Sequence, residues 1–246
     1  MYEGLLIDID YLLNVVKELK INFDKKIKTL NLLVERNIPI VLYTENNKEY
    51  VDTIMKYLKI KEPAIIVEGA QIYSPFDLSY EAVFPLSINT VCKLGNWAMD
   101  RKMDMSISTD KKVIDYSEWL KELRQVNYKN AGDKFPSAVK VDICMKNDDK
   151  RIELLNFIGK NNLECYAHMY LNHVACINSI VDKGNTLKYL ANKKKWDIKK
   201  FAMIGDYSKD TSIFDEVGFL MSISDFTKDF EKNFDKTLKS DMMSIV

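Results

Sequence analysis

Two pairs of aspartates, far apart in the sequence, carry the side chains best suited to binding a metal ion. Asp8 and Asp10 end a short apolar run near the start, and Asp206 and Asp210 follow another apolar run near the end. Carboxylates that gather in one place repel one another, and a hard cation with oxygen ligands offsets that repulsion. The four aspartates therefore predict a Mg²⁺ site if the fold brings them together, whereas Asp8-Ile9-Asp10 alone could also be a solvated strand-to-loop turn.

The apolar runs before these aspartates have the pattern of strands buried on both faces. Further runs of the same kind alternate with segments whose apolar residues recur at helical spacing. Such alternation predicts a parallel sheet covered by helices on both sides. The expected strands are residues 4–7, 38–43, 64–67 and 201–204, and the expected helices are residues 24–36, 47–58, 185–195 and 208–217.

Ligands of open α/β sheets bind beyond the carboxyl ends of the strands. Asp8, Asp10, Asp206 and Asp210 all follow predicted strands, and Thr44 follows the strand at 38–43. We therefore expect these five side chains to share one crevice. A threonine in this position is also a common helix N-cap, so Thr44 alone does not distinguish a ligand from a cap.

The middle of the chain differs in composition from its two ends. Residues 79–176 contain more tyrosine, lysine and asparagine, with strand-like runs at 138–145 and 174–177. The expected fold is a doubly wound parallel α/β core, residues 1–78 and 177–246, with a smaller α+β domain inserted at 79–176. The highly charged segment 225–241 is expected to be a solvated terminal helix or loop.

Composition indicates small-molecule partners. Lysine plus arginine and aspartate plus glutamate number 36 each, which gives no overall field that would attract nucleic acid or an anionic membrane. No run approaches the roughly 18 apolar residues of a membrane span, and the start has no secretory-leader pattern, so a cytoplasmic location is expected. The four cysteines form no CxxC pair and are expected to be reduced core thiols. No apolar stripe indicates an oligomer interface.

At four places in the same order the chain resembles the haloacid dehalogenase superfamily. Asp8-Ile9-Asp10 after an apolar strand matches the first motif, and Thr44 after a buried strand matches the second. Lys183, which opens a predicted helix, matches the third. The stretch from Gly205 to Asp210 matches the fourth, and Lys183 precedes Asp206 by 23 residues, a separation that suits one helix and one strand.

The resemblance implies a role for each matched residue. Asp8 would be the nucleophile that forms an aspartyl-phosphate, and Asp10 would be the general acid and base. Thr44 and Lys183 would bind the phosphoryl group. The Mg²⁺ ligands implied are Asp8, the backbone carbonyl of Asp10, Asp206 and Asp210.

A further likeness indicates the Cof-type branch, subclass IIB. Residues 68–73, Glu-Gly-Ala-Gln-Ile-Tyr, resemble the branch's Asn-Gly-Ala-x-Ile-Tyr stretch, and its cap domain is inserted between the second and third motifs, as the segment 79–176 is. The resemblance implies a Mg²⁺-dependent phosphatase that hydrolyses a small phosphomonoester such as a sugar phosphate. The cap would lie over the carboxyl edge of the sheet and read the leaving group.

The sequence departs from the family pattern beside these motifs. Tyr11 and Leu12 stand where a glycine and a threonine or valine are usual, which makes the expected loop after the nucleophile bulkier. Glu45-Asn46 replaces Gly-Arg, Lys209 replaces asparagine, and Glu68 replaces the asparagine of Asn-Gly-Ala. Two alternatives therefore stay open: a phosphomutase that uses the same aspartyl-phosphate, and a phospholigand-binding protein that has lost turnover.

Overall fold

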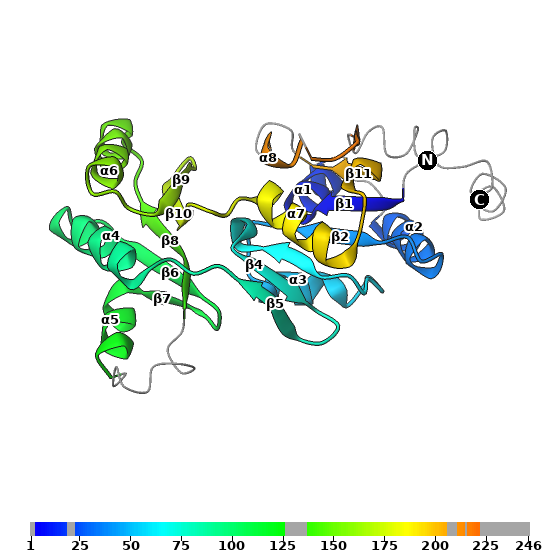
Figure 1. The fold of residues 1–246 in the computed structure, drawn as a ribbon, viewed down its shortest axis with the longest axis horizontal. Coiled ribbons are helices and arrows are strands. Elements are labelled where there is room, and N and C mark those ends of the chain that lie inside the picture. Colours follow the sequence, from blue (N-terminus) through cyan, green and yellow to red (C-terminus); the bar gives the residue numbers. More distant parts are fainter. Residues whose placement is uncertain (1–2, 19–22, 126–136, 206–210, 215, 222–246) are drawn as a thin grey trace. The chain divides into compact units, whose positions relative to one another are not determined.

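The computed structural model describes residues 3–18, 23–125, 137–205, 211–214 and 216–221. The chain divides into two compact units, which we call the core unit (1–82 and 182–246) and the insert unit (83–181). Each unit has its own sheet and its own hydrophobic cluster. Figure 1 labels the helices and strands of both.

In the described residues, the core unit contains a seven-stranded sheet in the order β12-β11-β1-β2-β3-β4-β5. The first five of these run parallel, as predicted, and the antiparallel β4 extends the sheet beyond β3. The strands are β1 (Gly4–Asp8), β2 (Ile40–Tyr43), β3 (Ala64–Ile66), β4 (Gln71–Ser74), β5 (Ser79–Val83), β11 (Phe201–Ile204) and β12 (Phe219–Met221).

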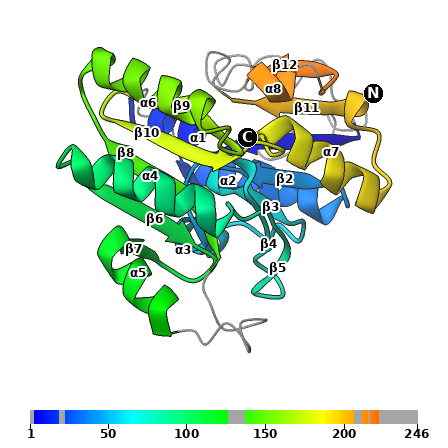
Figure 2. The same ribbon diagram turned by 60° about the vertical axis from the view of Figure 1, so that its left-hand side comes forward.

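Helices cover both faces of this sheet, as expected for a doubly wound fold. Leu187 and Leu190 of α7 pack with Leu6 and Met203 on one face, and Figures 1 and 2 show α2 and α3 on the other. Residues of β1, β2, β3 and β11 are buried whichever face they point to, which explains the uninterrupted apolar runs. The helices are α1 (Ile9–Glu18), α2 (Phe23–Glu35), α3 (Lys48–Met55), α7 (Lys183–Lys194) and α8 (Thr211–Phe214), with short 3₁₀ turns η1 (Val67–Gly69) and η3 (Ile198–Lys200).

Some expected elements are wrong in detail. The segment after Asp8 is helix α1 and not a loop, because backbone N–H groups of its first turn bond to the Asp8 carboxylate. The strand expected at 64–67 ends at Ile66, where η1 begins. The helix expected at 47–58 is α3, which begins after its cap Asn47 and ends at Met55. The segment 225–241 lies outside the described residues.

In its described residues, the insert unit has a five-stranded antiparallel sheet in the order β7-β6-β8-β10-β9. Helices α4, α5 and α6 place Leu94, Trp119 and Leu154 in one hydrophobic cluster with Val141 and Cys176 of the sheet, so all three cover the same face (Figure 2). The elements are β6 (Met105–Thr109), β7 (Val113–Asp115), β8 (Ala138–Cys144), β9 (Cys165–Met169), β10 (His173–Asn178), α4 (Ile88–Asp100), α5 (Tyr116–Gln125) and α6 (Asp148–Lys160). The predicted fold class, an α/β core with an α+β insert, is confirmed.

All four cysteines are free thiols, but not all lie in a core. Cys165 and Cys176 are buried and Cys92 is partly buried, whereas Cys144 is exposed. The expectation of a core thiol is wrong for Cys144, because alternation along β8 turns it away from the hydrophobic cluster that Ile143 joins. Within the described part of the chain, no helix is long and apolar enough to cross a membrane.

Candidate active site

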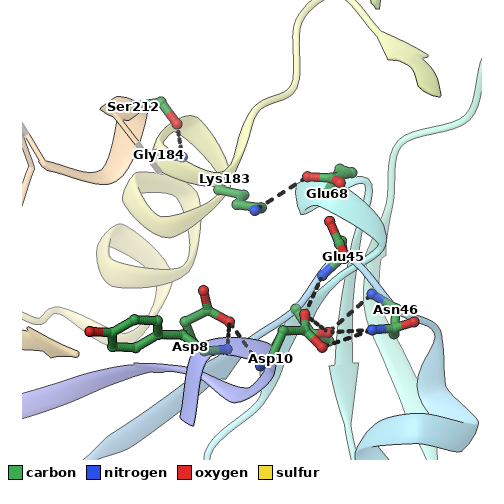
Figure 3. A network of polar contacts seen from close by, with 10 residues as sticks. Asp8, Asp10, Glu45, Asn46, Glu68, Lys183, Gly184 and Ser212 are labelled. Atoms are coloured by element: carbon green, nitrogen blue, oxygen red, sulfur yellow. Dashed lines mark hydrogen bonds and ion pairs between the residues drawn. The ribbon is translucent and has the colours of Figure 1, made fainter. Parts of the chain in front are cut away.

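Asp8 is the last residue of β1 and its side chain is buried, with 7% of its surface exposed. Its Oδ1 accepts the backbone N–H groups of Asp10 at 2.9 Å and Tyr11 at 3.1 Å. These donors belong to the first turn of α1, where the helix dipole also favours a negative charge. The carboxylate is therefore fixed in orientation and stabilised as an anion, and its second oxygen is turned away from the two donors (Figure 3).

Asp10 is held by the segment that follows β2. The Thr44 hydroxyl donates to Asp10 Oδ2 at 2.6 Å, the Asn46 amide Nδ2 donates to Oδ1 at 2.8 Å, and the Glu45 N–H lies 3.3 Å from Oδ2. Thr44 is itself 1% exposed, and its oxygen accepts the Asn46 N–H at 3.0 Å. Parallel pairing of β1 with β2 sets this contact, because Asp8 is in register with Tyr43.

Tyr50 adds a hydroxyl beside the same carboxylate. It lies in the first turn of α3, whose cap Asn47 accepts the Tyr50 N–H at 3.4 Å. Burial, a hydrogen bond with Asp10 and the negative charges of Asp10, Asp8 and Glu45 raise the pKa of Tyr50 to about 12. The phenol therefore stays neutral at physiological pH.

Lys183 is the first residue of α7 and pairs with a carboxylate from a distant segment. Its Nζ lies 3.3 Å from Oε2 of Glu68, and the two side chains are 13% and 2% exposed. The same ammonium lies 5.7 Å from the centre of the Tyr43 ring, within the range of a cation–π contact. Figure 3 shows Lys183 and Glu68 facing each other in the same site as Asp8 and Asp10.

Gly205 gives the site its tight packing where β11 ends. A Cβ at this position would lie 2.1 Å from the Tyr43 hydroxyl and 3.3 Å from the Asp8 Cβ. Any larger residue would therefore displace the side chains beside the expected nucleophile. Steric packing therefore explains why the fourth motif opens with glycine in this chain.

The structure places the predicted residues as follows. Asp8, Asp10 and Thr44 come together through direct hydrogen bonds, and Lys183 belongs to the site through Glu68 and Tyr43. Asp206 and Asp210 lie outside the described residues. Among the residues that are described, no three metal-ligating side chains gather into one group.

The donors that are described suit a hard cation. Asp8 offers carboxylate oxygens at the carboxyl end of a parallel sheet, which is the ligand chemistry that Mg²⁺ prefers. The expected ligation by the Asp10 carbonyl does not suit this structure, because Asp10 lies within α1, where backbone carbonyls point along the helix axis to N–H groups of the next turn. Asp8, Asp10 and Glu45 lie close enough to Tyr50 to add to the rise in its pKa that burial causes, and a cation would offset their negative charge. The residues present therefore fit Mg²⁺.

Three residues of the site were not predicted to have a role. Asn46 and Tyr50 contact Asp10, and Glu68 pairs with Lys183. Sequence position gave some signal for each, because Asn46 and Tyr50 follow Thr44 closely and Glu68 follows the next buried strand. Their contacts depend on side-chain directions that periodicity does not predict.

Comparison with known proteins identifies the family. A sequence model of the haloacid dehalogenase-like hydrolases matches residues 5–242. A search of curated proteins finds no match. A haloacid dehalogenase-like hydrolase from Bacteroides thetaiotaomicron superposes with a TM-score of 0.71, at 13% identity over 90% of this chain and 94% of that one.

Two further solved structures are similar over most of their length. One from B. subtilis, also a haloacid dehalogenase-like hydrolase, has a TM-score of 0.69 at 15% identity and covers 89% of this chain and 88% of its own. A subclass IIB sugar phosphatase of the superfamily has a TM-score of 0.67 at 13% identity. The match covers 93% of this chain and 98% of the phosphatase. At such low identity the similar structures show the fold alone. The family is shown by the sequence model, which matches nearly the whole chain. The protein belongs to the haloacid dehalogenase-like hydrolase family, which confirms the resemblance and the expectation of an enzyme of this family.

Proposed function

We propose that the protein is a Mg²⁺-dependent phosphohydrolase that cleaves a small phosphomonoester through an aspartyl-phosphate on Asp8. The observation that carries the proposal is the fixed pair of carboxylates at the end of β1. Asp8 is held by two backbone N–H groups, and Asp10, two residues later, is held by Thr44 and Asn46. Two preorganised carboxylates with different partners suit one nucleophile and one acid–base group.

In the first step the carboxylate of Asp8 attacks phosphorus, and the ester oxygen leaves. The leaving alkoxide takes a proton from Asp10, so Asp10 becomes the carboxylate. In the second step this carboxylate takes a proton from a water that attacks the same phosphorus. The acyl–phosphate bond breaks, and inorganic phosphate and Asp8 are released.

The hydrogen bonds to Asp10 give it a defined place for both proton transfers. Thr44 and Asn46 bind its two oxygens from the β2 side, and Tyr50 lies beside it. A general acid must lie within hydrogen-bond distance of the leaving oxygen. A side chain that hydrogen bonds hold in one orientation meets this requirement more often than a mobile side chain.

Asp8, with Asp206 and Asp210, would hold the Mg²⁺. The chemistry that bound Mg²⁺ supplies is alignment of the phosphoryl oxygens and screening of their charge from Asp8. Lys183 would supply a second positive charge to the phosphoryl group.

Residues 79–176 are proposed to act as the cap that reads the leaving group. The insert unit has its own core and its own sheet, as a separate specificity domain requires. Its three helices cover one face of that sheet, and the opposite face carries Lys140, Asp142 and His173, which are polar and partly exposed. Polar side chains on a sheet face suit a hydroxyl-rich leaving group, such as the sugar of a sugar phosphate.

One observation favours a second candidate, a phospholigand-binding protein with weakened turnover. Both groups expected to bind phosphate contact carboxylates in the structure: Thr44 donates to Asp10, and Lys183 pairs with Glu68. A hydroxyl has one proton to donate, so Thr44 can bond a phosphoryl oxygen only by releasing Asp10.

The test is phosphate release from a panel of phosphomonoesters, with and without Mg²⁺. Asp8→Asn is the matched variant, because its amide oxygen can still accept the two N–H groups while the nucleophilic charge is gone. We expect Mg²⁺-dependent release from the wild type and a fall of at least about 100-fold in the variant. Borohydride should trap the acyl phosphate and convert Asp8 to homoserine, which peptide mass spectrometry detects.

The products separate the candidates. An isomerised sugar phosphate without free phosphate would indicate the phosphomutase. Binding of Mg²⁺ and phosphate without any product, in a folded protein, would refute hydrolysis and favour the binding protein.

A further inference from the structure

The turn between β3 and β4 has an unusual backbone. Val67, Glu68 and Gly69 have φ values of 52°, 58° and 93°, three consecutive residues in the left-handed region. This conformation is rare for non-glycine residues and is a genuine outlier for a β-branched residue such as Val67. Such a conformation persists only where surrounding contacts fix it.

Those contacts come from the two segments that carry the candidate chemistry. The Val67 N–H donates to the Asn46 carbonyl at 3.0 Å, next to the amide that holds Asp10. On the other side, the buried Thr186 hydroxyl of α7 donates to the Gly69 carbonyl at 2.7 Å. The turn is therefore bonded to the segment after β2 and to the first turn of α7.

Gly69 brings the turn against the start of α7. A Cβ at Gly69 would lie 2.9 Å from the backbone carbonyl of Asp182 and 3.0 Å from the Lys183 nitrogen. Only glycine allows this approach at a φ of 93°. The consequence is that Glu68, one residue earlier, faces Lys183 from a distance of 3.3 Å.

Lys183 needs a hydrogen-bond acceptor beside its ammonium, and an anionic acceptor suits it best, for a physical reason. A cation in the first turn of a helix lies at the positive end of the helix dipole, and this one is also mostly buried. Glu68 is 2% exposed, so its carboxylate also needs a cationic partner. The pair satisfies both requirements, and Tyr43 contacts the ammonium from the sheet.

We infer that Glu68 is a positioning residue, which acts through Lys183 by holding its ammonium in place beside Asp8 and Asp10. The residue departs from the asparagine of the family pattern, so this chain uses a longer, charged side chain where a shorter neutral one is usual. The catalytic consequence rests on the proposed function, because Lys183 is the group that would contact the phosphoryl oxygens. The positioning of Lys183 by Glu68 does not depend on the proposed function.

The first experiment measures the position of Lys183 without any substrate. The ammonium protons of an ion-paired, buried lysine are protected from exchange with water, so its ¹⁵N signal can be observed by NMR. The signal is assigned to Lys183 by its absence in the double variant Lys183→Met, Glu68→Gln. The glutamine is included so that removal of the lysine leaves no buried carboxylate unpaired. We expect the signal in the wild type, its loss in Glu68→Asn, and its retention in Glu68→Gln. Asparagine tolerates a positive φ but is too short to reach the ammonium, whereas glutamine keeps the length and the acceptor oxygen. A wild type without the signal, or an unchanged signal in Glu68→Asn, would overturn the inference.

The second experiment measures phosphate release by the same variants. Misplacing a binding group lowers kcat by roughly 10- to 100-fold, so we expect that loss in Glu68→Asn, with a smaller change in KM and substantial rescue in Glu68→Gln. An active wild type with an equally active Glu68→Asn would refute the catalytic consequence and leave the proposed function standing. A wild type that releases no phosphate would refute the proposed function, and the lysine signal would still decide whether Glu68 positions Lys183.

Discussion

Replacing Thr44 by valine removes one hydroxyl and leaves the side chain almost unchanged in shape. The hydroxyl donates to the Asp10 carboxylate at 2.6 Å and accepts the Asn46 N–H at 3.0 Å, at a position only 1% exposed. A hydrogen bond to a charged group contributes about 1.5–3 kcal/mol, and a neutral one about 0.5–1.5 kcal/mol. Asp10 keeps the Asn46 amide as a donor, so we expect Thr44→Val to lower the free energy of unfolding of the core unit by about 2–3 kcal/mol.

Thr44→Ser is the matched control, because it keeps the hydroxyl and loses only a buried methyl group. That loss should cost about 1 kcal/mol, so the serine variant should be the more stable of the two. Fluorotryptophan labelling allows the units to be followed separately, because Trp196 packs on Phe201 in the core unit, while Trp97 and Trp119 lie in the insert cluster. Urea titration followed at the ¹⁹F signal of Trp196 gives the midpoint for each variant. A valine variant as stable as the wild type, or more stable than the serine variant, would refute the assignment of these hydrogen bonds.

Four further outcomes are expected. Gly205→Ala should destabilise the core unit by about 1–3 kcal/mol in urea and reduce phosphate release, because its Cβ would lie 2.1 Å from the Tyr43 hydroxyl; unchanged stability and release would contradict this packing. Asp10→Asn should lower kcat for phosphate release by about 10²–10⁴-fold, and a smaller loss would argue against its acid–base role. Burial raises the pKa of Tyr116 to about 12. The unfolded chain therefore loses this proton first, near pH 10, and the stability that the neutral phenol contributes below pH 10 should decline between pH 10 and 12; absorbance at 295 nm, with Tyr116→Phe as control, checks this. Mg²⁺ at 100 times its Kd should stabilise the wild type by about 2.7 kcal/mol and Asp8→Asn by much less, and equal stabilisation of both would place the ion elsewhere.

Much of the core fold was readable from the sequence because its strands are buried on both faces. The runs expected as strands at 4–7, 38–43, 64–67 and 201–204 contain β1, β2, β3 and β11 of one sheet, apart from shifts at their ends, and parallel pairing brings the carboxyl ends of these strands to one edge. Helix α1 was missed because the residues after Asp8 were expected to form a loop, although the carboxylate that ends the strand is also what binds the first N–H groups of the helix. The antiparallel strand β4, which lies between β3 and the edge strand β5, was missed as well, since a strand of four residues has too little periodicity to predict its direction.

The candidate site was predictable as residue types and less so as contacts. Motif order predicted the roles of Asp8, Asp10, Thr44 and Lys183, and the structure shows which side chains bond to them. The partners Asn46 and Glu68 were noted only as departures from the family pattern, because a single sequence says which residue is present and not where it points. A residue that departs from the family pattern can still contribute to the site. Asn46, for example, donates a hydrogen bond to Asp10, the same carboxylate that Thr44 binds.

The contacts at the site link charge balance to backbone geometry. Lys183 pairs with Glu68, and the carboxylates of Asp8, Asp10 and Glu45 add to the burial that raises the pKa of Tyr50. The strained turn at residues 67–69 is bonded to the Asn46 segment on one side and to α7 on the other, so Lys183 and the groups that hold Asp10 share one supporting element. A phosphoryl group that took Lys183 from Glu68 and the Thr44 proton from Asp10 would leave two carboxylates without those partners. Cation binding at the carboxyl edge of the sheet would offset that cost, which is the physical reason to expect phosphate and Mg²⁺ to bind cooperatively in this protein.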